Sequence, residues 1–138
     1  MIEFEVIGKI VGKQRPRFNM YTKRTYTPSK TKNYEDMISY SFYNKYKKFK
    51  PLSSNLEVHL IFYFEIPKSY TKKQRLEIQN GTVRPNKKPD IDNCIKSVLD
   101  ALNKVAYNDD TQILKIIAEK KYTFEQEKVN IIIKEIEE

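Results

Sequence analysis

This 138-residue sequence lacks the features of secreted and membrane-bound proteins. Its single cysteine, Cys94, cannot form an internal disulfide, which suits a reducing cytoplasm. It has no apolar run near the roughly 20 residues that a helix needs to span a bilayer. Its first ten residues are charged and alternating, unlike a signal peptide. These absences predict a soluble cytoplasmic protein that has no membrane partner.

The sequence also lacks any stretch that would divide it into parts. It has only three glycines, no Gly-rich or Pro-rich linker and no internal repeat. A chain of this length can bury roughly two thirds of its unfolded surface around one core. We therefore predict a single domain over residues 1–138.

Two segments have almost no acidic residues. The run from Lys9 to Lys32 has eight Lys or Arg and no acid, and the run from Lys68 to Lys88 has seven and one acid. In a chain of formal net charge +8, such clusters are typical of nucleic-acid binders, although a solvated lysine-rich surface is the alternative. The candidate phosphate contacts in these runs are Lys13, Arg15, Arg17, Arg84, Lys87 and Lys88.

Hydrophobic periodicity predicts an α+β fold, with a mixed β-sheet and two main helices packed on it. The strands are expected at 2–11, 56–66, 111–124 and 127–138, the last two as an antiparallel pair. One main helix runs from Ser29, as its N-cap, to about Lys48, and the other begins after Pro89. A short exposed helix is expected between Thr71 and Gly81.

Carboxylates gather around the second main helix, within "KPDIDNCIKSVLDALNKVAYNDDTQI" at 88–113. Asp90 suits an N-cap, Asp92 lies one helical turn before Lys96, and Asp109–Asp110 suit a polar turn. These ordinary structural roles need fewer acids than the segment holds. A hard cation such as Mg²⁺, bound against a phosphodiester, would offset the repulsion between the carboxylates.

The length of this helix restricts which of its acids can share a metal ion. If the helix ran straight to Tyr107, Asp110 would lie roughly 25 Å from Asp92. If it ended near Asn103, residues 104–110 could return about 23–25 Å as an extended strand beside it. We therefore expect an early helix end and an extended return.

These motifs resemble those of the RusA-type Holliday-junction resolvases, which are common in phages and prophages. The resemblance lies in "KPDIDNCIKSVLDAL" followed by "YNDDTQI", and in "GKQRPRF" near the N-terminus. It implies a Mg²⁺-dependent endodeoxyribonuclease that cuts four-way junction DNA symmetrically as a homodimer, in DNA recombination and repair. The order of elements agrees over essentially the whole chain. Two departures are Cys94, in place of an aliphatic residue, and Asn103-Lys104, where a glycine often ends the helix.

The resemblance also implies roles for individual residues. The family's metal-binding aspartates fall on Asp90, Asp92 and Asp110, its essential lysine falls on Lys96, and Asp109 is the neighbouring acid. Asp90, Asp92, Lys96 and Asp110 are thus the candidate catalytic residues. The alternatives are a non-catalytic basic DNA-binding protein of the same fold and a basic protein of a ribonucleoprotein. A binder gains nothing from carboxylates near phosphate, so an enzyme is favoured.

Two aromatic residues lie in the basic segment before the first helix. Residues 12–28 predict an irregular loop or a small hairpin, with 18–21 against 25–27. Phe18 and Tyr21 are candidates to stack on bases near a DNA branch point. Packing in the core or in a dimer interface is the favoured interpretation for both.

Overall fold

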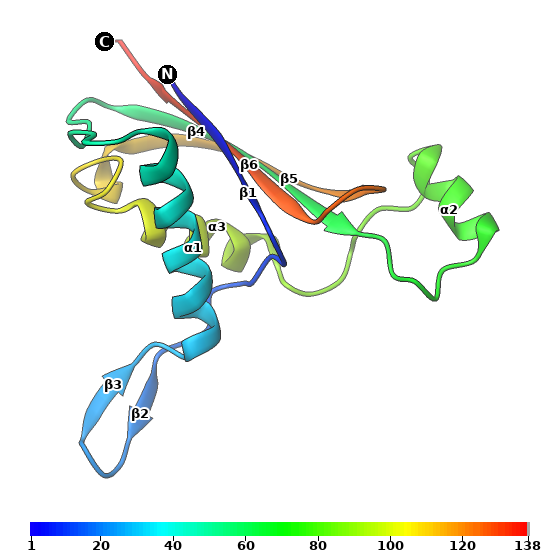
Figure 1. The fold of residues 1–138 in the computed structure, drawn as a ribbon, viewed down its shortest axis with the longest axis horizontal. Helices are drawn as coiled ribbons and strands as arrows, with labels where there is room; N and C mark the ends of the chain where they lie inside the picture. Colours follow the sequence, from blue (N-terminus) through cyan, green and yellow to red (C-terminus); the bar gives the residue numbers. More distant parts are fainter. Residues whose placement is uncertain (138) are drawn as a thin grey trace.

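A mixed four-stranded sheet with two helices on one face forms the body of the protein (Figure 1). The computed structural model describes residues 1–137. Its elements are β1 (Ile2–Ile7), β2 (Arg17–Asn19), β3 (Arg24–Tyr26), α1 (Ser29–Lys45), β4 (Leu56–Glu65), α2 (Lys72–Gln79), α3 (Ile91–Leu102), the 3₁₀ turn η1 (Asp110–Gln112), β5 (Ile113–Thr123) and β6 (Lys128–Glu135). The predicted α+β class, with two main helices packed on a mixed sheet, is confirmed.

The order of strands in the sheet is β1-β6-β4-β5. β4 pairs with β6 in the antiparallel sense and with β5 in the parallel sense. The prediction that the last two strands pair with each other is therefore wrong, because β4 lies between them. The Glu127 carboxylate, in their connection, accepts hydrogen bonds from the backbone N–H of Glu65 (3.0 Å) and of Ile10 (2.7 Å). These bonds hold the connection where it passes the end of β4.

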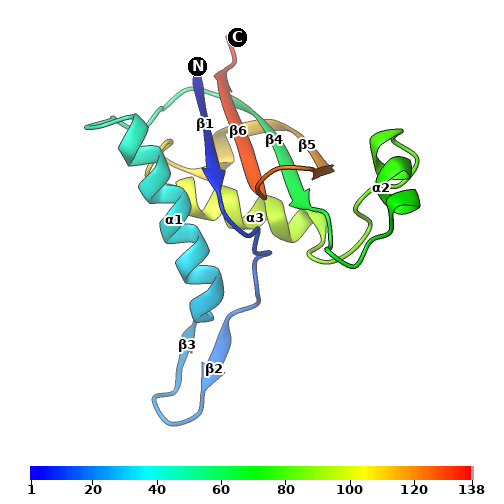
Figure 2. The same ribbon diagram turned by 45° about the vertical axis from the view of Figure 1, so that its right-hand side comes forward.

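The hydrophobic core lies between the sheet and the helices α1 and α3 (Figure 2). Successive side chains of a strand point to opposite faces, and alternate residues of β4 are buried against the helices. The helices contribute buried side chains to this core, namely Ile38 and Phe42 from α1 and Cys94, Val98 and Leu102 from α3. This packing fixes the position of α3, which carries the candidate carboxylates, relative to the sheet.

The first strand and the first helix differ slightly from the prediction. β1 ends at Ile7 and not near Val11, because Gly8 has a φ of 141° and donates its backbone N–H to the carbonyl of Glu127 (2.9 Å). α1 begins at Ser29, with Pro28 as its N-cap, and ends at Lys45. Ser29 is therefore the first residue of the helix and not its cap.

The start of α2 and both ends of α3 lie where the sequence places them. The Thr71 hydroxyl accepts a hydrogen bond from the Gln74 N–H, and the Gln74 side chain accepts one from the Thr71 N–H, which is a capping box. Asp90 is the N-cap residue of α3, and Asn103 is its C-cap.

Two basic segments project away from the body (Figure 1). The hairpin of β2 and β3 extends beyond the N-terminal end of α1, and it confirms the hairpin alternative for residues 12–28. The arm at 67–88, which contains α2, extends past the end of β4. Among residues 1–137, no helix is long and apolar enough to cross a bilayer.

Candidate functional site

A groove of about 520 Å³ lies between the segment after β1 and the start of α3. Its charged lining consists of Lys9, Lys13, Lys30, Lys88 and Asp90. Sequence reasoning proposed three of these residues and missed Lys9 and Lys30. Both belong to the acid-free run from Lys9 to Lys32, which was the signal for a basic surface. The groove thus places a carboxylate among cationic side chains, as a phosphate-binding surface with a metal site requires.

Hydrogen bonds hold residues 11–13, which form one wall of the groove, against α3. The Lys13 N–H donates to the carbonyl of Asn93, and the Ser97 hydroxyl donates to the carbonyl of Val11, both at 2.8 Å. Gly12 allows this close approach, because a Cβ atom there would lie 2.7 Å from Cβ of Pro89. The segment is therefore fixed beside the first turn of the helix.

Lys120 of β5 holds the loop that carries Asp90. Its ammonium donates hydrogen bonds to the backbone carbonyls of Pro89 (3.0 Å) and Lys87, and it lies 5.3 Å from the centre of the Phe64 ring. This role was not predicted from the sequence, because the alternation of residues in a strand does not indicate which lysine bonds to a neighbouring loop. The start of α3 is thus held from the sheet as well as from residues 11–13.

The carboxylates of Asp90, Asp92 and Asp110 make no hydrogen bond or ion pair with any residue that the structure describes. Asp90 occupies the N-cap position without capping through its side chain, and no ion pair joins Asp92 to Lys96. Side-chain capping by Asp90 and the Asp92–Lys96 pair are therefore not formed, whereas Asp109 and Asp110 do lie in the polar turn that was considered for them. Lys96 likewise has no partner within residues 1–137.

The other two acids of this segment do have structural partners. Asp109 accepts hydrogen bonds from the Thr111 hydroxyl (2.6 Å) and the Thr111 N–H (3.2 Å), which lower the pKa of its carboxyl. Asp100 pairs with Lys13 at 3.1 Å. The segment's acids thus divide into engaged ones and free ones, and the free ones are the three that the sequence resemblance predicted as metal ligands.

The free carboxylates lie at opposite ends of α3. Twelve helical residues rise about 18 Å, so Asp90 and Asp110 are separated by a distance on the order of 20 Å. Burial first, and then the charges of Asp90 and Asp92, raise the pKa of the Cys94 thiol to about 11, although Lys120 opposes the rise. Burial, followed by the charges of Asp110, Asp100 and Asp109, raises the pKa of Tyr107.

The predicted extended return after α3 is wrong, although the helix ends where expected. Lys104 takes a left-handed conformation with φ of 65°, and its N–H donates to the carbonyl of Tyr107 (2.7 Å). The buried Tyr107 donates its hydroxyl to the carbonyl of Leu99 (2.5 Å). This compact turn leads to β5, which begins beside the start of β4. Asp110 therefore stays near the C-terminal end of α3, away from Asp90 and Asp92 at its N-terminal end. Among residues 1–137, no three His, Cys, Asp or Glu side chains lie close enough to hold one metal ion.

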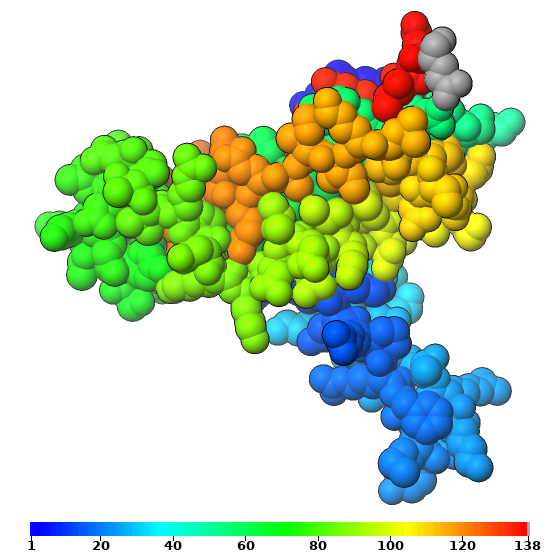
Figure 3. Space-filling view, turned by 180° about the vertical axis from the view of Figure 1, so that it is seen from behind, coloured from blue at the N-terminus to red at the C-terminus, as the bar shows by residue number. Residues whose placement is uncertain are grey.

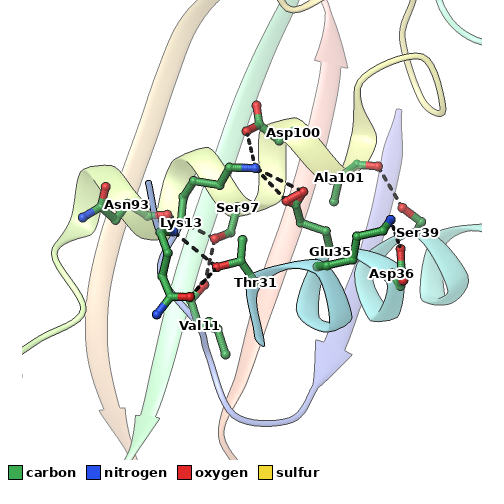
Figure 4. Close-up of polar contacts among 12 residues, drawn as sticks. Val11, Lys13, Thr31, Glu35, Asp36, Ser39, Asn93, Ser97, Asp100 and Ala101 are labelled. Atoms are coloured by element: carbon green, nitrogen blue, oxygen red, sulfur yellow. Dashed lines mark hydrogen bonds and ion pairs between the residues drawn. The ribbon is translucent and has the colours of Figure 1, made fainter. Parts of the chain in front are cut away.

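Lys13 occupies a different place from the one its sequence context suggested (Figure 4). Its ammonium lies 2.9 Å from Glu35 of α1 and 3.1 Å from Asp100 of α3. Burial opposes its charge, but these two carboxylates raise its pKa above the ordinary 10.5. Lys13 thus joins the two helices and is not a free cation for phosphate.

The remaining basic candidates lie on the two projections and beside the groove. Arg15, Arg17 and Lys88 form no ion pair with any residue among 1–137. Arg84 lies 4.0 Å from Glu119, and the Lys87 ammonium lies 4.9 Å from the centre of the Tyr70 ring. Of these five residues, Lys88 lines the groove itself.

Comparisons with known proteins agree with the motif assignment. The family described as "Endodeoxyribonuclease RusA" matches residues 8–134. The "Uncharacterized protein YqaN" of Bacillus subtilis (strain 168) is 30% identical over 139 residues, covering 98% of this chain and 96% of the relative. The matched region includes the groove, both ends of α3, the whole of β4 and β5, and β6 except its last residue, and it leaves out β1.

Proposed function

Because this chain belongs to the RusA endodeoxyribonuclease family, we propose that it is a Mg²⁺-dependent enzyme that resolves four-way DNA junctions by paired phosphodiester hydrolysis. We place this activity in the cytoplasm, in DNA recombination and repair, and assign the chain to a phage or prophage. The observation that supports it most is the free state of Asp90, Asp92 and Asp110, since neighbouring acids of the same segment are engaged. An unpaired carboxylate beside a lysine-lined groove repels phosphate unless a cation lies between them.

The donor chemistry at the start of α3 fits a hard divalent cation. Mg²⁺ usually takes one or two protein carboxylates, and substrate phosphate and water complete its octahedron. Asp90 and Asp92 provide two such carboxylates, without competing protein partners. When bound, the ion would supply Lewis-acid polarisation of the scissile phosphate.

The other residues of the site bind and orient the DNA strand. Lys9, Lys30 and Lys88 line the groove and hold the phosphate backbone against Asp90. Lys96 lies one helical turn after Asp92, on the same side of α3. Its free ammonium stabilises the charge that develops on the phosphoryl oxygens or the leaving 3′-oxygen. Lys120 keeps the loop before α3 in place and is a positioning residue.

Asp110 joins this site only if a second chain brings it there. β5 is an edge strand, and its exposed large hydrophobic side chains are Leu114 (62% exposed), Ile116 (41%) and Ile117 (46%). Figure 3 shows β5, in orange, on the surface between the arm and the end of α3. Such an edge is suited to pair with another strand. We propose that two copies of β5 pair in the antiparallel sense about a two-fold axis.

We infer the position of that axis from the exposed hydrophobic residues of β5, which should face each other across the dimer. An axis between residues 115 and 116 places Leu114 of one chain opposite Ile117 of the other. The same register places Ile113, where β5 begins, opposite residue 118 of the other chain. Asp110, in the 3₁₀ turn before β5, then lies toward the end of the partner strand that carries Lys120, which holds the loop before Asp90. A homodimer of this kind has two equivalent sites, each with Asp90 and Asp92 from one chain and Asp110 from its partner. Two equivalent sites are what symmetric cleavage of a junction needs.

Cleavage assays test the activity directly. We expect a mobile four-way junction to be cut with Mg²⁺ and left intact with EDTA, and a linear duplex of the same sequence to be spared. Asp90→Asn, Asp92→Asn and Asp110→Asn should each abolish cleavage and retain junction binding, because less negative charge faces the phosphate. Asp36→Asn is the matched control, since Asp36 is an exposed aspartate of α1 that pairs only with Lys32. Junction binding without cleavage by the unaltered protein would favour the non-catalytic DNA-binding protein.

Mixed dimers test where Asp110 acts. A dimer of one Asp90→Asn chain and one Asp110→Asn chain has one site with both changes and one intact site, if each site uses both chains. If each site belongs to one chain, both sites carry a change. Mixing the two inactive variants should therefore restore cleavage of one strand of the junction, and continued inactivity of a verified mixed dimer would contradict the shared site. Sedimentation of a monomer at micromolar concentration would contradict the dimer itself.

A further inference from the structure

We propose that the hairpin of β2 and β3 inserts into the branch point of the junction, where Tyr21 stacks on an exposed base and makes binding selective for branched DNA. This inference rests on the proposed function for its substrate, and it concerns a surface outside the candidate catalytic groove. The hairpin is the projection below α1 in Figure 2.

The tip of the hairpin presents aromatic and apolar side chains to solvent. Tyr21 is 99% exposed, Met20 is 80% exposed and Phe18 is 59% exposed. The interpretation favoured from the sequence for Phe18 and Tyr21 was packing in the core or in a dimer interface. Its first part is wrong, because both rings are exposed, and its second part stays a prediction. Exposed apolar groups gathered at one place commonly mark an interaction site.

The backbone of the tip is a defined turn. The Asn19 side-chain oxygen accepts hydrogen bonds from the N–H groups of Tyr21 (2.9 Å) and Thr22 (3.1 Å), and the Lys23 N–H donates to the carbonyl of Asn19 (2.8 Å). An asparagine that bonds the backbone two residues later fixes the shape of a turn. Met20 and Tyr21 are thus held at the outermost point of the projection, and little conformational freedom of the backbone is lost on binding.

The base of the hairpin is anchored to the body. The Gln14 N–H donates to the hydroxyl of the buried Thr31, which in turn donates to the Gln14 side-chain oxygen, both at 3.3 Å. Lys13, beside Gln14, joins α1 to α3 through Glu35 and Asp100 (Figure 4). The tip therefore has a fixed direction relative to α3, which carries Asp90.

The charge of the hairpin indicates which partner the aromatic tip contacts. Residues 15–26 contain Arg15, Arg17, Lys23 and Arg24 and no acid. Two copies of such a hairpin, each with four cations and no acid, would repel each other. A basic ribbon with aromatic rings is instead suited to nucleic acid, where cations meet phosphate and rings stack on bases.

The branch point is the part of a junction that a stacking ring can use. A continuous duplex keeps its bases stacked on each other, and separating them costs free energy. At a four-way branch point the stack is interrupted, so a ring can stack there at lower cost. The same segment forms the base of the hairpin and the wall of the groove, so a bound branch point would lie beside the strand held at Asp90.

Equilibrium binding without divalent cations tests this proposal on the full chain. The substrates are a four-way junction with 2-aminopurine at the branch and a linear duplex of the same sequence. We expect Tyr21→Ala to lose roughly 5- to 150-fold in junction affinity, the range reported by removal of one stacked ring. Duplex affinity should change less than about twofold, and the rise in 2-aminopurine fluorescence on binding should disappear.

Two further variants isolate the effect of the ring. Tyr21→Phe keeps a stacking ring and should bind and unstack the junction as the unaltered protein does. Tyr40→Ala removes an exposed tyrosine of α1 (70% exposed) away from the hairpin, and it should change neither readout. Tyr21 has no side-chain hydrogen bond or ring contact with the part of the chain described, so the thermal unfolding midpoint should stay unchanged in Tyr21→Ala.

Several outcomes would overturn the proposal. Equal loss of junction and duplex affinity would show a non-selective contact, and unchanged junction binding would remove Tyr21 from recognition. Conversion of a dimer to a monomer in Tyr21→Ala would show that the tip contacts a second copy of the chain. These measurements do not depend on cleavage. The hairpin proposal can therefore fail for a protein that cleaves junctions, and it can hold for a protein that binds junctions without cleaving them.

Discussion

The substitution Gly12→Ala is expected to harm the candidate site more than it harms the fold. A Cβ atom at residue 12 would lie 2.7 Å from Cβ of Pro89 and 3.2 Å from Cβ of Asn93. Carbon atoms that are not bonded to each other prefer a separation of about 3.5–4.0 Å, so one wall must move by roughly 1 Å. Pro89 and Asn93 both lie at the start of α3, on either side of Asp90. The added Cβ atom must therefore displace either the start of α3, with Asp90, or the groove segment that contains residue 12.

The size of both effects follows from this displacement. Inserting one carbon into a packed contact costs about 1–3 kcal/mol of unfolding free energy. For a chain of this length that lowers the unfolding midpoint by roughly 4–12 °C. A misplacement of about 1 Å in a catalytic constellation costs on the order of 10² in rate. We therefore expect a folded protein that cleaves about a hundredfold more slowly.

Gly81→Ala is the matched control for this experiment. Gly81 has a φ of 78°, which an alanine adopts at a cost of roughly 1–2 kcal/mol, and an added Cβ would meet no atom within 4 Å. The control thus loses comparable stability and leaves the groove unchanged. Thermal unfolding and single-turnover cleavage at saturating enzyme measure the two effects. A wild-type cleavage rate in Gly12→Ala, or an equal loss of rate in Gly81→Ala, would refute the reasoning.

Four further predictions concern individual side chains. Lys96→Ala should lower the single-turnover rate by roughly 10²–10³ without a change in unfolding midpoint, because its ammonium has no partner in the described chain; a near-wild-type rate would exclude it from the chemistry. Asp109→Ala should lower the unfolding midpoint and Asp110→Ala should not, because only the Asp109 carboxylate accepts the hydrogen bonds that hold the turn; equal midpoints would contradict this assignment. Cys94 should react with a thiol reagent at about pH 8 only on unfolding, because burial raises its pKa to about 11; fast labelling of the folded protein would contradict the burial. Lys13 has a raised pKa when folded, so its ion pairs stabilise the fold below about pH 10.5 and are lost as pH rises through the folded value; Lys13→Met should show a smaller decrease in stability across alkaline pH than the unaltered protein does.

The sequence was sufficient to predict features that depend on neighbouring residues. The cap at Thr71, the start of α3 after Pro89 and the alternation of β4 all follow from residues within a few positions of each other. The family assignment, read from "KPDIDNCIKSVLDAL" and "YNDDTQI", is confirmed for the same reason, since short motifs carry it.

The features that the sequence could not predict depend on the rest of the fold. The length of residues 104–110 allowed an extended return to Asp92, but it carried no information on the left-handed Lys104 or the buried Tyr107 that prevent it. Sequential strands usually lie side by side, and this tendency gave the wrong partner for β5. A run of basic residues likewise does not reveal that Lys13 meets two carboxylates.

The pairing of β1 with β6 has a consequence for the synthesis of the protein. Residues 2–7 pair with residues 128–133, and within the described chain β1 has no other strand neighbour. At a translation rate of about 5–20 residues per second, β1 waits roughly 6–24 s for its partner to be made. Glu127, which holds Ile10 at the start of the groove segment, arrives equally late. A nascent chain on the ribosome therefore has no assembled groove, and the groove can form only after residues 127–133 have emerged.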